Sequence, residues 1–299
     1  MSIKYLPPKS DFIFKKIFGD AKNTEILAAF LKSTLDIAPE EYEKIILTDT
    51  HINPVDERDK MGILDVKVQT KSGNLIDIEI QLANIPHMRE RIVFYLSKMV
   101  SSQISSGEKY NSIKRSIIIL ITDYKMIKEN NKYHNVYTLR DKDGSEFTNL
   151  MEINTLELPK LPQDADNSDL WNWMKFLKSR DEDEFKIMET KSKELRKAVG
   201  VLRELSQDEE TKLIFQAHEI ARMDYEDRVD GAFADGKAKG LQEGEIKGEI
   251  KGKIKSAIKM IEKYHISLKS AMIDFELDKK YKEQVINELN KQNIFYKEE

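Results

Sequence analysis

The sequence contains no cysteine, which excludes disulfide bonds and thiolate metal sites and favours a reducing compartment such as the cytosol. No apolar run reaches the length of a membrane-spanning helix, and residues 1–20 show no signal-peptide pattern. We therefore expect a cytoplasmic protein without a membrane partner. The net charge is only −4, which argues against binding nucleic acid through bulk positive charge. A bound metal ion and a local cluster of basic residues could still supply the attraction for nucleic acid.

Proline and glycine are both unevenly distributed. All seven prolines lie at or before Pro162, and six of the twelve glycines lie between Gly231 and Gly252. A chain of 299 residues is long enough for one large domain or two modest ones. We predict an α/β domain over residues 5–160, followed by an all-helical region over 165–299.

Two neighbouring segments, 62–69 and 75–82, alternate apolar and polar residues. This period of two is typical of half-buried strands, and the Lys71–Asn74 segment between them has turn composition. An antiparallel hairpin would gather the polar residues on one face. Clustered carboxylate oxygens are the ligands that a hard divalent cation such as Mg²⁺ prefers. The polar residues concerned are Asp65, Lys67, Asp77, Glu79 and Gln81.

The length of the turn decides whether Asp65 and Glu79 share a face. A two-residue loop puts the two acids on opposite faces, whereas a three-residue loop, 71–73, sets Asp65 opposite Glu79 and Lys67 opposite Asp77. The longer loop needs a left-handed residue at its last position, and Gly73 is there. Cross-strand neighbours have Cβ atoms roughly 4.5–5.5 Å apart, so two such carboxylates can share one metal ion.

At this point the sequence resembles a known group. Asp65, followed on the next strand by Glu79-Ile80-Gln81, is similar to the active-site motif of PD-(D/E)XK nucleases, and more narrowly to the recombination-promoting nuclease (Rpn)/putative transposase family. The resemblance implies a restriction-endonuclease-like mixed sheet flanked by helices. Three further segments match the family in order: Ser10–Gly19, His87–Tyr95, and Gly107–Tyr110 before the apolar run Ile117–Ile121.

The resemblance implies a Mg²⁺-dependent DNA endonuclease, with Mn²⁺ as a substitute metal. Asp65, Glu79 and the backbone carbonyl of Ile80 would hold the metal. The family normally has a lysine two residues after the glutamate, and Gln81 stands there instead. Glutamine can hydrogen-bond a water but brings no positive charge.

Several residues near this motif have two interpretations. Lys67 supplies the missing charge or forms a cross-strand ion pair with Asp77. Asp11 contributes to the metal site through water or caps the first helix. Arg89 and Arg91 contact phosphate or lie on a solvated helix face. The protein as a whole is either a nuclease linked to recombination, transposition or mobile-element defence, or a catalytically weak nuclease-fold protein that acts through its helical tail.

The helical region contains a glycine at every fourth position from Gly236 to Gly252. Each interior glycine costs about 0.8–1 kcal/mol relative to alanine, so three interpretations compete: a close helix contact, a flexible spacer, or repetitive expansion. We expect the first, with a homodimer formed through this region. A terminal helical hairpin is predicted over 267–292.

Overall fold

The computed structural model describes residues 4–48, 51–52, 62–63 and 66–299. The chain divides into two compact units, 1–218 and 219–299, and each is treated by itself below. No helix in the described ranges has the length and apolar composition needed to cross a bilayer.

The first unit is built on a six-stranded sheet with the strand order β1-β4-β5-β6-β8-β7. The three central strands, β5, β6 and β8, are parallel, and the outer pairs are antiparallel. The sheet is therefore mixed, as predicted. Its strands are β1 (Ile46–Leu47), β4 (Val66–Gln69), β5 (Leu75–Gln81), β6 (Ser116–Thr122), β7 (His134–Arg140) and β8 (Glu146–Glu157), and a separate pair joins β2 (His51–Ile52) to β3 (Gly62–Ile63).

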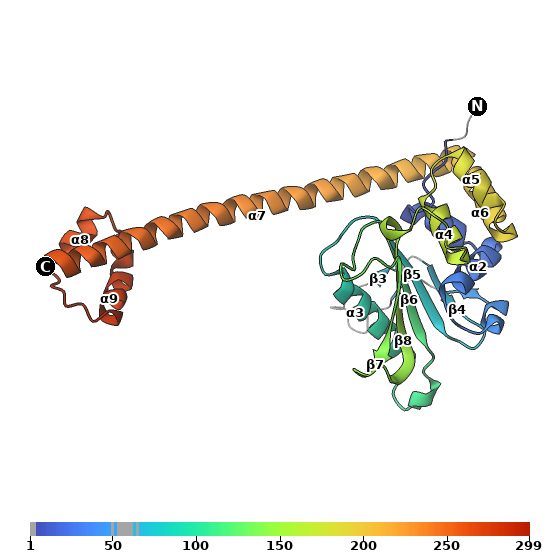
Figure 1. Ribbon diagram of the computed structural model, residues 1–299, viewed down its shortest axis with the longest axis horizontal. Helices are drawn as coiled ribbons and strands as arrows, with labels where there is room; N and C mark the ends of the chain where they lie inside the picture. Colours follow the sequence, from blue (N-terminus) through green and yellow to red (C-terminus); the bar gives the residue numbers. More distant parts are fainter. Residues whose placement is uncertain (1–3, 49–50, 53–61, 64–65) are drawn as a thin grey trace. The chain divides into compact units, whose positions relative to one another are not determined.

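Helices cover both faces of this sheet, α3 on one side and the remaining helices of the unit on the other (Figure 1). Ser10 accepts a hydrogen bond from the N–H of Ile13 and so caps the first helix, which excludes that role for Asp11. Ser168 caps α4 in the same way, by accepting the N–H of Trp171. The helices are α1 (Asp11–Phe18), α2 (Thr24–Thr34), α3 (Met88–Ser101), α4 (Asp169–Lys178), α5 (Glu182–Glu189) and α6 (Lys193–Gln207).

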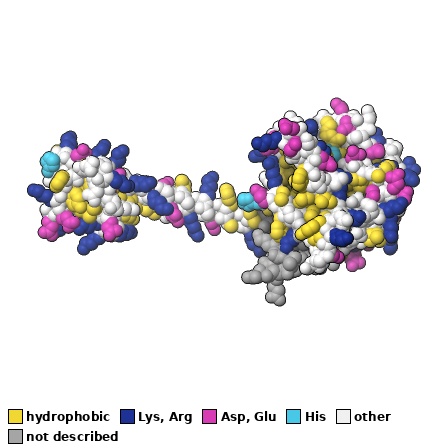
Figure 2. Space-filling model, turned by 90° about the horizontal axis from the view of Figure 1, so that it is seen from below, with side chains coloured by type: hydrophobic (Ala, Val, Ile, Leu, Met, Phe, Trp, Pro, Cys, Tyr) yellow, Lys and Arg dark blue, Asp and Glu magenta, His cyan; other side chains and the backbone are white. Residues whose placement is uncertain are grey.

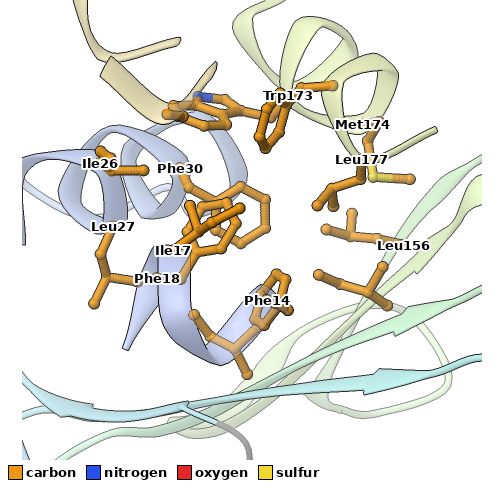
Figure 3. Close-up of a cluster of buried hydrophobic side chains, with 14 of the residues drawn as sticks. Phe14, Ile17, Phe18, Ile26, Leu27, Phe30, Leu156, Trp173, Met174 and Leu177 are labelled. Carbon is orange, nitrogen blue, oxygen red and sulfur yellow. The ribbon is translucent and has the colours of Figure 1, made fainter. Parts of the chain in front are cut away.

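The main core lies between the sheet and the face covered by α1, α2, α4 and α6. Rings of Phe18, Phe30 and Trp173 meet at centroid distances of 5.4–6.1 Å and fill its centre (Figure 3). Trp173 and Leu202 belong to this same cluster of buried side chains. The compact unit thus continues to His218, beyond the predicted boundary at 160, because α4–α6 bury their apolar faces against α1, α2 and the sheet.

The second unit contains the greater part of α7 (Glu209–Tyr264) together with α8 (Leu268–Asp274) and α9 (Lys282–Lys291). The three helices enclose a separate small core in which Ile258 and Ile261 of α7 meet Leu268, Val285 and Leu289. The terminal helical hairpin of the sequence prediction corresponds to α8 and α9. An isolated pair of helices this short is only marginally stable in water, and packing against the end of α7 completes the core.

Candidate active site

The hairpin of β4 and β5 has the register that the three-residue turn predicts. Lys67 pairs with Asp77, and Val66 pairs with Ile78. The N–H of Thr70 donates to the Asn74 carbonyl at 2.9 Å, and the N–H of Gly73 donates to the Thr70 carbonyl at 3.0 Å. Gly73 has φ +96°, the left-handed conformation that this turn requires and that glycine adopts at no steric cost.

A carboxylate from outside the hairpin holds this turn. Glu41 Oε2 accepts hydrogen bonds from Thr70 Oγ1 at 2.5 Å, from Ser72 Oγ at 2.8 Å and from the Ser72 N–H at 3.1 Å. The Thr70 hydroxyl is the main reason that the pKa of Glu41 lies below its ordinary value. Glu41 therefore ties the turn to the segment before β1 and stabilises the register of the hairpin.

The polar face of β5 is buried, which corrects the prediction of a half-buried strand. Asp77 has 0% and Glu79 2% of its surface exposed, whereas Gln81 at the end of the strand is half-buried. In the sheet these positions adjoin Ile118 and Leu120, which pack against α3. Burial follows because α3 covers this face, and a buried carboxylate must be compensated by hydrogen bonds, counter-ions or a metal. Ile80 points to the opposite face and joins the main core.

The structure places one acid of the predicted metal pair. Glu79 offers a carboxylate, the hard oxygen donor that Mg²⁺ prefers. Asp65, the second predicted ligand, lies outside the described residues. Among the residues described, no three His, Asp or Glu side chains are grouped so as to hold a metal ion. The donor chemistry at Glu79 fits a divalent cation, and the rest of the ligand set stays a prediction.

The start of the chain is joined to the end of β6, close to the end of β5. The N–H of Asp123 donates to the Gln81 carbonyl at 3.0 Å, and the Asp123 carboxylate forms an ion pair with Lys9. Asp11 follows two residues after Lys9 and pairs with Lys15 within α1 at 3.1 Å. The predicted acid Asp11 is thus on a segment tied to the carboxyl end of β6, and its role in metal binding stays a prediction.

A buried ion pair anchors the loop that leaves β6. Lys160 Nζ lies 2.9 Å from Glu157 Oε1, with side-chain exposures of 3% and 0%. Glu157 Oε2 accepts the N–H of Met126 at 2.8 Å and that of Ile127 at 3.3 Å. This pair was not predicted from the sequence, although a lysine three residues after an acid at the end of a strand was a visible signal.

A cation-lined hollow of about 280 Å³ lies between this loop and the segment that joins β5 to α3. Arg89 donates to the Met126 carbonyl at 2.9 Å and lies 3.5 Å from Glu129, so its guanidinium is fixed at the wall. Crevices outside the carboxyl ends of parallel strands are common ligand sites in α/β folds. The other basic residues that line the hollow are His87, Lys125 and Lys128.

Two further side chains lie near this end of the sheet. Arg91 donates from Nε to Tyr95 Oη at 2.9 Å and lies over that ring, so it is held on α3 itself. Tyr124, two residues after β6, has a buried hydroxyl for which the described part of the chain provides no hydrogen-bond partner. Burial raises the pKa of Tyr124, which keeps its phenol a proton donor. No sequence pattern distinguishes this tyrosine.

The family of the protein follows from comparison with known proteins. The family model described as PD-(D/E)XK nuclease family transposase matches residues 8–232. This span covers the whole sheet, the described β4–β5 hairpin and the helices through the first part of α7. The chain belongs to this family, and the Rpn resemblance is consistent with it. No curated protein and no solved structure matches the chain.

Proposed function

We propose that the protein is a metal-dependent DNA endonuclease that hydrolyses phosphodiester bonds in recombination, transposition or defence against mobile elements. The observation that carries the proposal is the placement of Glu79 and Gln81 on one face of β5. A hollow lined by Arg89, Lys125 and Lys128 adjoins the segment that follows this strand. Family membership supports the same reaction class.

The residues have distinct roles in this proposal. Asp65 and Glu79 hold Mg²⁺ or Mn²⁺, with the Ile80 carbonyl as a further ligand. When bound, the metal polarises the scissile phosphate and lowers the pKa of a water. Gln81 can donate a hydrogen bond to that water through its amide N–H or accept one at its carbonyl oxygen, and so fixes the direction from which the water attacks. Asp11 contributes through an intervening water.

The positive charge that the family lysine would bring must come from elsewhere. Lys67 is on the same face as Asp77 and Glu79, one strand away. Its cross-strand position opposite Asp77 supports an ion pair and at the same time keeps its ammonium on the face that carries Glu79. Arg89 is fixed by the Met126 carbonyl and presents its cation at the hollow.

A plasmid-nicking assay tests the proposal. The wild type should nick supercoiled DNA with Mg²⁺ or Mn²⁺, and EDTA should abolish nicking. Glu79→Gln and Asp65→Asn should each remove cleavage and weaken Mn²⁺ binding in a calorimetric titration, while circular dichroism and melting show a folded protein. Asp20→Asn, a change at the cap after α1, is the matched control and should cleave normally. A Glu79→Gln variant that cleaves at the wild-type rate would contradict the site assignment.

The helical region supports a second proposal, a homodimer formed through α7. The second unit has its own core, and a Cβ atom added at any glycine from Gly236 to Gly252 would meet nothing in the described chain. The substitution Gly240→Ala, Gly244→Ala, Gly248→Ala raises helix propensity by about 2–3 kcal/mol in total. If these positions form a close contact, light scattering should show a weaker dimer despite the better helix. A wild type that is monomeric at micromolar concentration would refute the dimer.

Two observations favour the catalytically weak alternative, namely Gln81 in place of the lysine and the low net charge of the chain. It predicts no nicking with any metal by a folded, assembled protein. The nicking assay and the scattering measurement together distinguish the two functions.

A further inference from the structure

The charges of α7 in the second unit are separated by sign along the helix. Residues 219–235 contain six acidic and two basic side chains, a net charge of −4. Residues 250–264 contain five basic and one acidic, a net charge of +4. The segment between them, 236–249, contains three of each sign together with four of the repeated glycines. The helix is therefore acidic at one end, basic at the other and neutral in the middle.

Large apolar side chains are exposed on the same helix. Phe233 has 73% of its surface exposed, Leu241 66% and Val229 44%. Single exposed apolar residues are ordinary on protein surfaces, but several along one helix are typical of an interaction surface. A Cβ atom built at Gly240, like one built at any of the repeated glycines, has no heavy-atom neighbour within 4 Å in the described chain.

Lysines gather where the basic end meets the small core. Lys251, Lys255 and Lys259 are spaced four residues apart on α7 and line a groove of about 640 Å³ between α7 and α9. Figure 2 shows Lys and Arg side chains, in dark blue, over this part of the molecule. Ile254 and Ile258 form the apolar floor of the groove. An acidic helix with exposed apolar residues has the complementary character.

We propose that the acidic end of α7 from a second copy of the chain occupies this surface, so that the two α7 helices pair antiparallel and cross in the glycine-rich middle. An antiparallel pair sets the −4 segment of each helix against the +4 segment of the other, and does so twice. A parallel pair sets like charges together at both ends. Such an antiparallel pair is a two-fold symmetric, self-complementary interface.

The apolar residues fit the same arrangement. In an antiparallel pair centred near Leu241, Phe233 of one helix faces the neighbourhood of Gly248 in the other, where glycine leaves room for the ring. Glycine lets two helix backbones approach closely, which compensates for its poor helix propensity. This inference depends on the proposed dimer but not on the proposed nuclease activity.

The ion pairs within the helix do not cancel this asymmetry. Arg222 and Glu219, 2.8 Å apart, both lie in the acidic segment, so its net charge already counts their pair. Glu249, 3.0 Å from Lys253, lies in the neutral segment, and counting it with residues 250–264 still leaves a net charge of +3. Charge complementarity between partners sets orientation and specificity more than bulk affinity. Salt screens such interactions, so the dimer should weaken as ionic strength rises.

Cysteine cross-linking of the full chain tests the orientation directly, because the protein contains no native cysteine. Ala234→Cys and Lys247→Cys, which leave every glycine of the repeat unchanged, are prepared separately, mixed, allowed to exchange subunits and treated with a short bismaleimide. The two positions are 13 residues apart, about 20 Å along a helix. The antiparallel pair predicts cross-links only between the two variants. Cross-links of each variant with itself would show a parallel pair and overturn the proposal.

Charge reversal tests the complementarity. Lys251→Glu, Lys255→Glu, Lys259→Glu should raise the dissociation constant of the dimer about tenfold or more in sedimentation experiments. Adding Asp224→Lys, Asp227→Lys, Asp230→Lys to the same chain should restore dimerisation. The control Lys269→Glu, Lys279→Glu, Lys297→Glu makes the same charge change outside α7 and should leave the dimer intact. Circular dichroism monitors folding, and a failure of the compensating changes to restore a folded variant's dimer would overturn the inference.

Discussion

Lys67 on β4 and Asp77 on β5 are direct cross-strand partners on the sheet face that α3 covers. The pairing brings a cation within one strand of Glu79, whose side chain points to the same face. It also supports both roles considered for Lys67, the ion pair and the source of charge that Gln81 cannot supply.

Substitution of Lys67 and Gln81 separates these roles. We expect Gln81→Ala to slow cleavage by about 10²–10³-fold, the usual effect of removing one stabilising hydrogen-bond donor from a catalytic site. Gln81→Lys should keep or raise the rate, since it restores the charge. Single-turnover cleavage of a labelled duplex measures both effects. Lys67→Ala tests whether Lys67 supplies the missing charge. If the cleavage rate is unchanged and only the thermal stability falls, Lys67 has a structural role in the ion pair with Asp77 and none in cleavage.

Tyr124→Phe tests the buried hydroxyl at the end of β6. A buried hydroxyl without a partner costs about 1–3 kcal/mol, so its removal should leave the melting temperature unchanged or higher. If the hydroxyl donates to a bound phosphate or water, the cleavage rate should fall about tenfold, the equivalent of one hydrogen bond. Melting curves and cleavage rates are measured on the same preparation. If Tyr124→Phe cleaves at the wild-type rate, the Tyr124 hydroxyl has no role in cleavage.

Glu41→Gln should make stability less dependent on pH. The pKa of Glu41 is lowered in the folded protein from an ordinary value near 4.5, so its stabilising contribution is complete above that pH. The contribution disappears as the pH falls through the lowered folded-state value. At pH 7 we expect the variant to be less stable by about 1 kcal/mol, because the Thr70 and Ser72 bonds no longer have a charged acceptor. Urea unfolding at pH 7 and pH 3 should show that difference shrinking in acid.

The cations of the hollow should control DNA affinity through the phosphate backbone. We expect Lys125→Gln together with Lys128→Gln to weaken binding to all duplex sequences alike. The slope of log affinity against log salt concentration should fall in magnitude by about two, because each lysine that neutralises a phosphate contributes about one. Fluorescence anisotropy in EDTA measures binding without cleavage. Lys142→Gln, in the exposed turn before β8, is the control. If this substitution reduced affinity and salt dependence as much per lysine, the hollow would not be a specific binding site for the DNA backbone.

Local sequence features predicted the β4–β5 hairpin well. The turn length and Gly73 determine the register within a few residues, without help from the rest of the chain. The apolar run Ile117–Ile121 lies in β6, since a continuous apolar run suits a strand that is covered on both faces. The resemblance of Glu79-Ile80-Gln81 to a nuclease motif identified the family that the comparison confirmed.

Tertiary packing limited the other predictions. Alternation in β5 indicates which residues share a face, but only the position of α3 shows that this face is buried. The last prolines, Pro159 and Pro162, suggested a domain boundary. The structure shows that α4 and α6, which follow them, pack in the same main core as the sheet. The burial of Tyr124, and the bonds that Glu157 accepts from Met126 and Ile127, depend on contacts between segments that are distant in sequence, so composition could not reveal them.

The turn at 71–73 also places a parity constraint on how this chain can change length. Successive side chains of a strand point to opposite faces, so one residue gained or removed in the turn moves Lys67 and Asp77 to opposite sides of the sheet. Two residues gained together keep both on the same side. Natural insertions and deletions at this turn should therefore occur in even numbers wherever Lys67 and Asp77 remain on the same face of the sheet.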